Sequence, residues 1–142
     1  MVSLKSLIAS SLLVIPFASA RITNLSAPAT AQNGTNVTAV LNTESYIQNW
    51  IDYASGLAPQ VIWGLSTPEF ADCTACLGEG IQYTDLYDNN ESNTLRGNIT
   101  VQVTIPADTA SGPHTLIAAV PYLVGASGGT GLSYFRSNIT IS

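Results

Sequence analysis

Two cysteines three positions apart, Cys73 and Cys76, form the motif with the clearest chemical potential. A CxxC motif serves as a redox pair, as half of a metal site or as a short disulfide loop. A structural zinc site needs four suitable ligands, and beyond these cysteines the chain offers only one histidine, His114. A thioredoxin-type thiol needs a helix N-terminus in a βαβ context, which the surrounding sequence does not predict. We therefore expect a Cys73–Cys76 disulfide, formed in an oxidising compartment, that shapes the loop at residues 68–80.

The segment Gly125-Ala126-Ser127-Gly128-Gly129 matches the G-x-S-x-G pattern of a nucleophile elbow. In that fold an acid and then a histidine follow the serine along the chain, but no Asp, Glu or His follows Ser127. A triad built on His114 would need a serine and an acid brought to it by the fold. We interpret residues 125–131 as a glycine-rich hairpin loop and His114 as a structural residue. No catalytic residue is predicted, and we expect that the protein is not an enzyme.

Acidic and amide side chains gather at residues 85–91, and hard cations such as calcium take oxygen ligands from such loops. The spacing is not that of an EF-hand, so a solvated turn is the better interpretation, and neither a metal nor a cofactor is predicted.

Aromatic side chains crowd the middle third of the chain and could fill the core, stack on sugars or anchor a protein partner. We expect Trp50 in the core, because sandwiches of the immunoglobulin type often bury a tryptophan on the third strand. Trp63 and Tyr87 are the candidates for exposed, sugar-binding aromatics.

Hydrophobic alternation predicts β-strands as the elements that position these residues. In residues 98–105, apolar side chains alternate with polar ones, which is typical of a half-buried strand. Alternation also predicts strands at residues 35–42 and 134–141, and a run that is apolar on both sides predicts a central strand at residues 114–124. With further strands expected at residues 21–25, 50–57 and 81–87, the chain has about seven. A helix over residues 46–54 is the alternative to the third strand. We therefore predict an all-β fold, an immunoglobulin-like antiparallel β-sandwich.

The first twenty residues have the order of features found in a secretory signal peptide. Lys5 gives a positive start, an apolar run follows at residues 7–17, and Ala18-Ser19-Ala20 has the small-x-small form of a cleavage site. Cleavage is expected between Ala20 and Arg21. Residues 1–20 are thus predicted to be a signal peptide and residues 21–142 a single β-sandwich domain of a secreted protein.

The chain after cleavage is strongly acidic, with three arginines against nine Asp and Glu residues and a net charge of −6. Binding to nucleic acid depends on clustered Lys and Arg, and an anionic membrane surface attracts basic segments. We therefore expect neither nucleic acid nor stable membrane insertion.

Six N-x-S/T sequons without proline support passage through the secretory pathway, because an occupied sequon must lie at the surface. Their asparagines are Asn24, Asn33, Asn36, Asn90, Asn98 and Asn138. Asn36, Asn98 and Asn138 fall on the polar faces of predicted strands.

Several short motifs also follow one another in a characteristic order along the chain. They comprise Arg21-Ile22-Thr23, Glu44 with Tyr46-Ile47-Gln48, Gly56-Leu57-Ala58-Pro59, Glu91-Ser92-Asn93 with Leu95, Asn98-Ile99-Thr100, Val103-Thr104-Ile105-Pro106 and Gly125-Ala126-Ser127. With these motifs the chain resembles the necrosis-inducing secreted protein family of fungal effectors over nearly its whole length after cleavage.

This resemblance implies a non-enzymatic effector of a plant-associated fungus. It implies binding to host receptor-associated immune kinases, suppression of pattern-triggered immunity and, for some members, cell death in leaves. An extracellular or apoplastic location is expected, with entry into the host cell as an alternative. The alternative function is an extracellular module that binds cell-wall polymers or other glycans, and an enzyme ranks last.

Overall fold

The computed structural model describes residues 21–44, 60–70, 72–86, 98–124 and 129–142. These residues form eight β-strands and one short 3-10 helix. The elements are β1 Arg21–Ser26, β2 Thr30–Ala31, β3 Asn36–Glu44, β4 Gln60–Ser66, η1 Pro68–Phe70, β5 Glu79–Asp85, β6 Ile99–Thr104, β7 Gly112–Val124 and β8 Gly129–Ile141. The predicted signal peptide, residues 1–20, lies outside the described residues.

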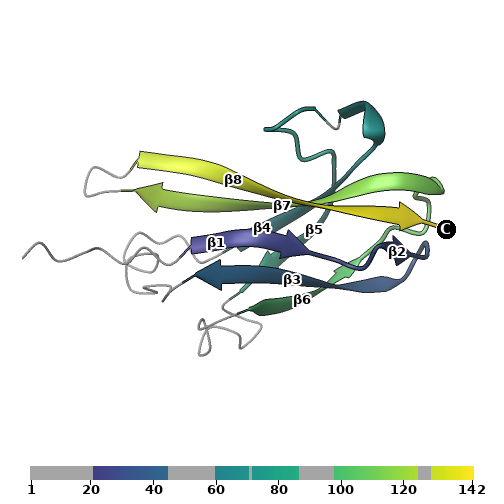
Figure 1. Cartoon of the computed structure of the whole chain (residues 1–142), viewed down its shortest axis with the longest axis horizontal. Coiled ribbons are helices and arrows are strands. Elements are labelled where there is room, and N and C mark those ends of the chain that lie inside the picture. Colours follow the sequence, from purple (N-terminus) through teal and green to yellow (C-terminus); the bar gives the residue numbers. More distant parts are fainter. Residues whose placement is uncertain (1–20, 45–59, 71, 87–97, 125–128) are drawn as a thin grey trace, which may run out of the picture.

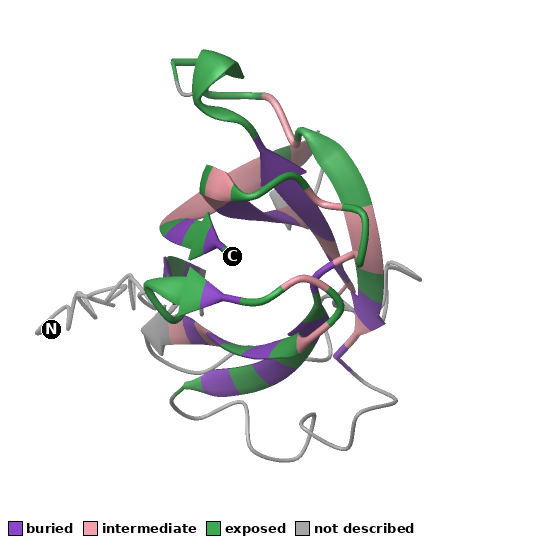
Figure 2. Cartoon of the chain, turned by 90° about the vertical axis from the view of Figure 1, so that its right-hand side faces the viewer, coloured by how far each residue is buried: buried purple, intermediate pink, exposed green. Residues whose placement is uncertain are grey.

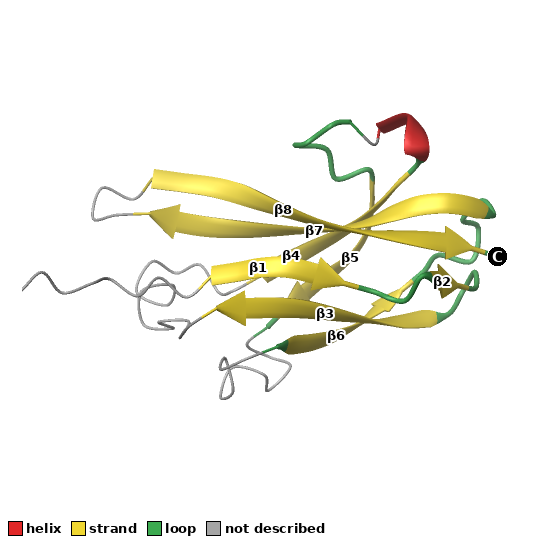
Figure 3. Cartoon of the chain, in the orientation of Figure 1, coloured by secondary structure: helices red, strands yellow, loops and turns green. Residues whose placement is uncertain are grey.

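The strands form two sheets that face each other as a β-sandwich (Figure 1). One sheet has three strands in the order β1-β3-β6, and the other has five in the order β2-β8-β7-β4-β5. All pairs are antiparallel except the short pair of β2 with β8. Figure 3 shows that loops and the single 3-10 turn account for the rest of the described chain. The predicted all-β sandwich is confirmed; the immunoglobulin-like type stays a prediction.

The core lies between the sheets and is built from the alternating positions of the strands. On β6, Ile99, Val101 and Val103 are at most 5% exposed, while the residues between them are exposed. Burial of each such side chain contributes roughly 1.5–3 kcal/mol. Trp63 of β4 is fully buried among these side chains, and its Nε1 donates a hydrogen bond of 3.0 Å to Oγ1 of Thr84. That bond satisfies the indole N–H inside the core.

Side chains link the two sheets along both open sides of the sandwich. On one side, the backbone N–H of Ala27, between β1 and β2, donates to Oγ of Ser137 on β8 at 3.2 Å. On the other side, the amide of Gln82 on β5 bridges to the backbone of β6. Its Nε2 donates to the Gln102 carbonyl at 2.8 Å, and its Oε1 accepts from the Thr104 N–H at 2.9 Å.

Two of the predicted elements need correction. The predictions contain no strand at residues 60–66, where β4 lies; the strand expected at residues 50–57 and the alternative helix fall outside the described residues. The glycine-rich loop expected over residues 125–131 is shorter than predicted, because β8 begins at Gly129 and pairs with β7 from there. The tryptophan expected in the core, Trp50, is not described. Trp63, which we expected to be exposed, is the buried one.

Candidate functional site

The connection from β4 to β5 stands out from the outer side of the five-stranded sheet (Figure 1). We call residues 68–70 and 72–78 of this connection the disulfide loop, because Cys73 and Cys76 are joined by a disulfide within it. The Cys73 N–H donates to the Phe70 carbonyl at 3.0 Å, so the disulfide closes a chain segment that already turns back on itself. The bridge forms a short ring on the loop and does not join the two sheets.

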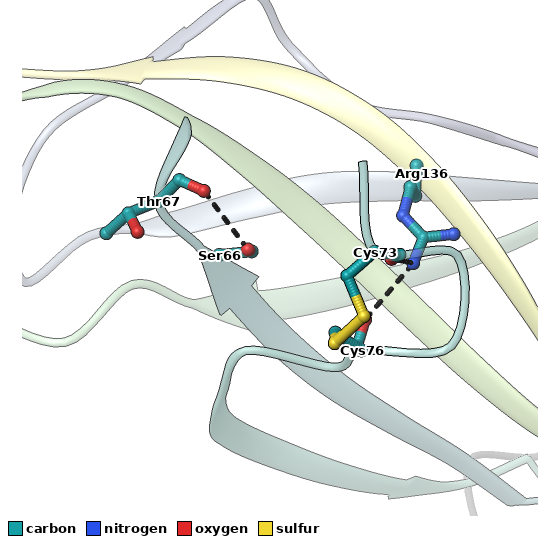
Figure 4. The surroundings of a disulfide bond; sticks show 5 residues. All are labelled: Ser66, Thr67, Cys73, Cys76 and Arg136. Atoms are coloured by element: carbon teal, nitrogen blue, oxygen red, sulfur yellow. Dashed lines mark hydrogen bonds between the residues drawn. A yellow bond between two sulfur atoms is a disulfide. The ribbon is translucent and has the colours of Figure 1, made fainter. Parts of the chain in front are cut away.

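Arg136 on β8 holds the disulfide loop against the sheet. Its Nη2 donates hydrogen bonds to the carbonyl oxygens of Cys73, at 2.7 Å, and of Cys76, at 3.1 Å (Figure 4). Hydrogen bonds from a charged donor are roughly twice as strong as neutral ones. The guanidinium carbon also lies 5.8 Å from the centre of the Tyr134 ring, within the range of a cation–π contact. One side chain thus ties the loop to a strand that lies 60 residues or more further along the chain.

A glycine on β4 lets the loop approach the sheet. A Cβ at Gly64 would overlap the carbonyl oxygen and the side chain of Leu77, so a larger residue would push the loop away. Beside Gly64 on β7 lies Ile117. Because Leu116 and Ala118 belong to the core, Ile117 points to the outside of the sheet. It is nevertheless only 2% exposed, and the close approach of Leu77 to the neighbouring Gly64 accounts for this cover.

Beyond the loop, the outer side of the five-stranded sheet carries exposed apolar side chains. Three large hydrophobic side chains stand out as exposed among the described residues: Phe70 at 55%, Tyr83 at 55% and Leu132 at 47%. Phe70 lies on the disulfide loop, Tyr83 lies opposite Ile62 of β4, and Leu132 lies opposite Pro121 of β7. We call this side the loop face: the outer side of the five-stranded sheet together with the disulfide loop. Figure 2 shows the loop as an exposed projection from it.

The opposite side of the sandwich, the outer side of the three-stranded sheet, holds three sequon asparagines; we call it the sequon face. Asn24 on β1, Asn36 on β3 and Asn98 just before β6 are all exposed. Oδ1 of Asn36 accepts a hydrogen bond of 2.8 Å from Oγ1 of Thr104. This bond engages the amide oxygen, and not the nitrogen to which an N-linked sugar would be attached.

The other three sequons lie elsewhere. Asn138 is exposed on β8, at the end of the loop face where Pro68 and Pro113 line a shallow groove with it. Asn33 is partly buried, and its Oδ1 is buried without a hydrogen-bond partner. Asn90 lies outside the described residues. The occupancy of all six sequons stays a prediction.

The remaining residues weighed for chemistry do not come together in the described part of the chain. Nδ1 of His114 lies 3.1 Å from the Gly112 carbonyl. No group of three or more His, Cys, Asp and Glu side chains that could hold a metal occurs among the described residues. Ser127 and most of the acidic segment at residues 85–91 lie outside them, and so does Tyr87. The described chain also contains no helix long and apolar enough to cross a membrane.

Arg136, Gly64 and Leu77 are the residues of this candidate site that the sequence did not single out. A lone arginine in an otherwise apolar and neutral strand, on a chain with few cations, was the available signal for Arg136. Nothing in the sequence indicates which carbonyl groups such an arginine would reach.

The fold and the disulfide loop define a small β-sandwich domain with a single local disulfide. The model of the Nis1 family matches residues 18–140. A curated relative, Necrosis-inducing secreted protein 1 of Colletotrichum higginsianum, is 37% identical over 124 residues, which cover 87% of this chain and 80% of the relative. The protein of the same name from Colletotrichum orbiculare is 33% identical over 131 residues, covering 91% of this chain and 73% of the relative. The chain belongs to the Nis1 family, which confirms the resemblance noted in the sequence.

Proposed function

We propose that this chain is a secreted effector of a plant-associated fungus that acts by binding a host protein. The observation that carries the proposal is membership of the Nis1 family, with two relatives named as necrosis-inducing secreted proteins. The chain is secreted into the extracellular space or the apoplast and enters the host cell from there to reach its partner, and induction of cell death in plant leaves is its visible effect.

The host proteins are receptor-associated immune kinases, and binding them suppresses pattern-triggered immunity. The protein performs no catalysis of its own. The support for a binding role is the exposed apolar surface of the loop face, together with a family resemblance that brings no catalytic residues. Surfaces with exposed aromatic anchors are typical of protein–protein contacts.

The test is co-precipitation of the glycosylated protein, residues 21–142, with purified cytoplasmic domains of plant receptor-associated kinases. We expect recovery of these domains above the level obtained with an unrelated secreted glycoprotein of similar size and charge. In parallel, leaves that express the protein should show a smaller oxidative burst after treatment with a microbial elicitor. Recovery at the control level, with an unchanged burst, would contradict the kinase assignment.

The alternative role as a glycan-binding module loses one of its two candidate aromatics, because Trp63 is buried in the core. Retention on chitin or glucan resin is the measurement that would restore it.

A further inference from the structure

Among the described residues, the large exposed apolar side chains lie on one side of the sandwich. The three large ones, Phe70, Tyr83 and Leu132, all belong to the loop face. Tyr134, on an outward position of β8, is partly exposed between Leu132 and the guanidinium of Arg136. An apolar patch of this kind on a small monomer marks a contact surface more often than a free one.

Negative charge borders this apolar surface. Glu69 and Asp72, on the disulfide loop, are exposed carboxylates. The guanidinium of Arg136, a cation on this side of the sheet, is engaged in hydrogen bonds to the Cys73 and Cys76 carbonyls of the loop. The rim of the loop face is therefore acidic, and a partner of opposite charge would be attracted to it.

Carbohydrate would leave the part of this surface around Tyr83 and Leu132 uncovered. Sugars attached at Asn24, Asn36 and Asn98 would cover the sequon face, on the far side of the sandwich. Asn138 lies on β8 six residues from Leu132, which is about 20 Å along an extended strand. A glycan there would border the loop face at one end and leave the region around Tyr83 and Leu132 open.

From these three observations we infer that the loop face is the docking surface of the protein, and that its partner is a protein with basic side chains around an apolar patch. The apolar centre supplies the buried contact area, and the carboxylates on the disulfide loop orient the partner. A second copy of this chain is a poor occupant, because it would bring the same acidic rim. The inference rests on the proposed function in one respect: the chain acts by binding another protein.

The experiment uses the glycosylated protein, residues 21–142, as bait in plant leaf extract, with quantitative mass spectrometry at low and at moderate salt. Two variants change the loop face: Asp72→Lys and Leu132→Lys. Each has a matched control elsewhere, Asp108→Lys at an exposed turn and Val40→Lys on the sequon face. All four positions are at least partly exposed, and equal melting temperatures establish that each variant is folded.

We expect the loop-face variants to lower recovery of the wild-type partners at least tenfold, while both controls retain it, and we expect recovery to fall as salt rises. Partners that survive both loop-face variants, or that are lost equally in the controls, would overturn the inference. So would a bait that enriches nothing, or a dimer in solution that Leu132→Lys dissociates. If the partners depend on the loop face but include no receptor-associated kinase, the kinase assignment fails and the docking surface stands.

Discussion

The outer sides of the two sheets belong to one small sandwich but are built for different surroundings. On the sequon face, the described outward positions of β3 and β6 are polar except for Val40, and two side-chain hydrogen bonds cross the strands, from Gln102 to Thr38 and from Thr104 to Asn36. On the loop face, the outward positions carry Tyr83, Ile62, Ala119, Tyr134 and Leu132, and an inserted loop covers part of them. The sequon face is suited to contact with water and carbohydrate, whereas the loop face has apolar side chains that the disulfide loop covers only in part.

This difference shows that alternation alone does not decide the role of a sheet surface. The sequon face follows the rule of apolar inside and polar outside. The loop face departs from it on β4, β5, β7 and β8, where one outward apolar side chain, Ile117, is buried beside the loop and another, Tyr83, is exposed. Covered positions should therefore govern stability, and exposed ones should govern binding.

The largest effect on binding should come from placing carbohydrate on the loop face. The double substitution Leu132→Asn with Tyr134→Thr creates an N-S-T sequon on β8, and the added sugar would block the docking of a partner. We expect loss of partner recovery by about tenfold or more, a cost of about 1.4 kcal/mol or more. A shift in gel mobility that a glycosidase reverses would establish attachment.

Each single substitution of that pair lacks a sequon and serves as its control. Binding that survives attached carbohydrate would contradict the location of the docking surface.

The largest effect on stability should come from Ile117→Ala. It empties a covered position under the disulfide loop, and such substitutions cost about 2–5 kcal/mol. The matched change on the sequon face is Val40→Ala, at a half-exposed outward position of β3. We expect it to cost about 1 kcal/mol or less. Urea unfolding followed by fluorescence gives both free energies, and equal values would mean that the loop does not cover Ile117.

Arg136→Ala should loosen the disulfide loop without opening the sandwich. Two hydrogen bonds from a charged donor are lost, which costs about 1.5–3 kcal/mol. Hydrogen exchange should become faster at residues 72–78 and stay unchanged on β3 and β6. Arg136→Lys should restore only part of the protection. It keeps the positive charge, but its ammonium lacks the fixed planar donors of the guanidinium. Faster exchange throughout both sheets would contradict a local role.

Loss of the disulfide should have a smaller effect. The ring spans only four residues, so by the loop-entropy relation Cys73→Ser with Cys76→Ser costs at most about 2 kcal/mol. We expect a melting temperature a few degrees lower and a cooperative transition. Wild-type protein treated with a thiol reductant should behave in the same way. A chain that fails to fold without the disulfide would show that the bridge supports the whole sandwich.

The smallest effect should come from Asn98→Gln on the sequon face. Exposed substitutions of this kind change stability by about 0.5 kcal/mol or less. We expect one fewer glycan by mass spectrometry, with partner binding unchanged. A loss of binding would mean that the sequon face takes part in recognition.

The sequence was sufficient for the strands whose two sides differ. Residues 98–105 were predicted correctly because one side of β6 meets the core and the other meets water. β4 was missed because apolar side chains stand on both of its sides. Val61, Trp63 and Leu65 face the core and Ile62 is half-buried on the outer side, so the segment shows no alternation. The third strand was instead predicted at residues 50–57, where Trp50 has more polar neighbours.

The attachment of the disulfide loop to the sheet by Arg136 could not be predicted from the sequence. The contact between Arg136 and the Cys73 and Cys76 carbonyls depends on the register of β8 against β7, and on a loop that folds back over β4. The close approach of that loop to β4 requires a glycine at position 64. From the sequence alone, a glycine in a strand is equally consistent with a bulge, a bend or a close contact. Local patterns constrain elements, whereas this site is made by three segments that meet only in the folded chain.

The bridge made by Gln82 also bears on how the protein behaves when it is crowded. The outer edge of β6 would otherwise present free backbone groups on which the strand of a neighbouring molecule could grow, the first step towards fibrils. A side-chain amide has the donor and acceptor of a peptide group, so Gln82 occupies that edge at Gln102 and Thr104 as a strand would. One glutamine therefore occupies two backbone groups on this edge that an incoming strand would need at high local concentration.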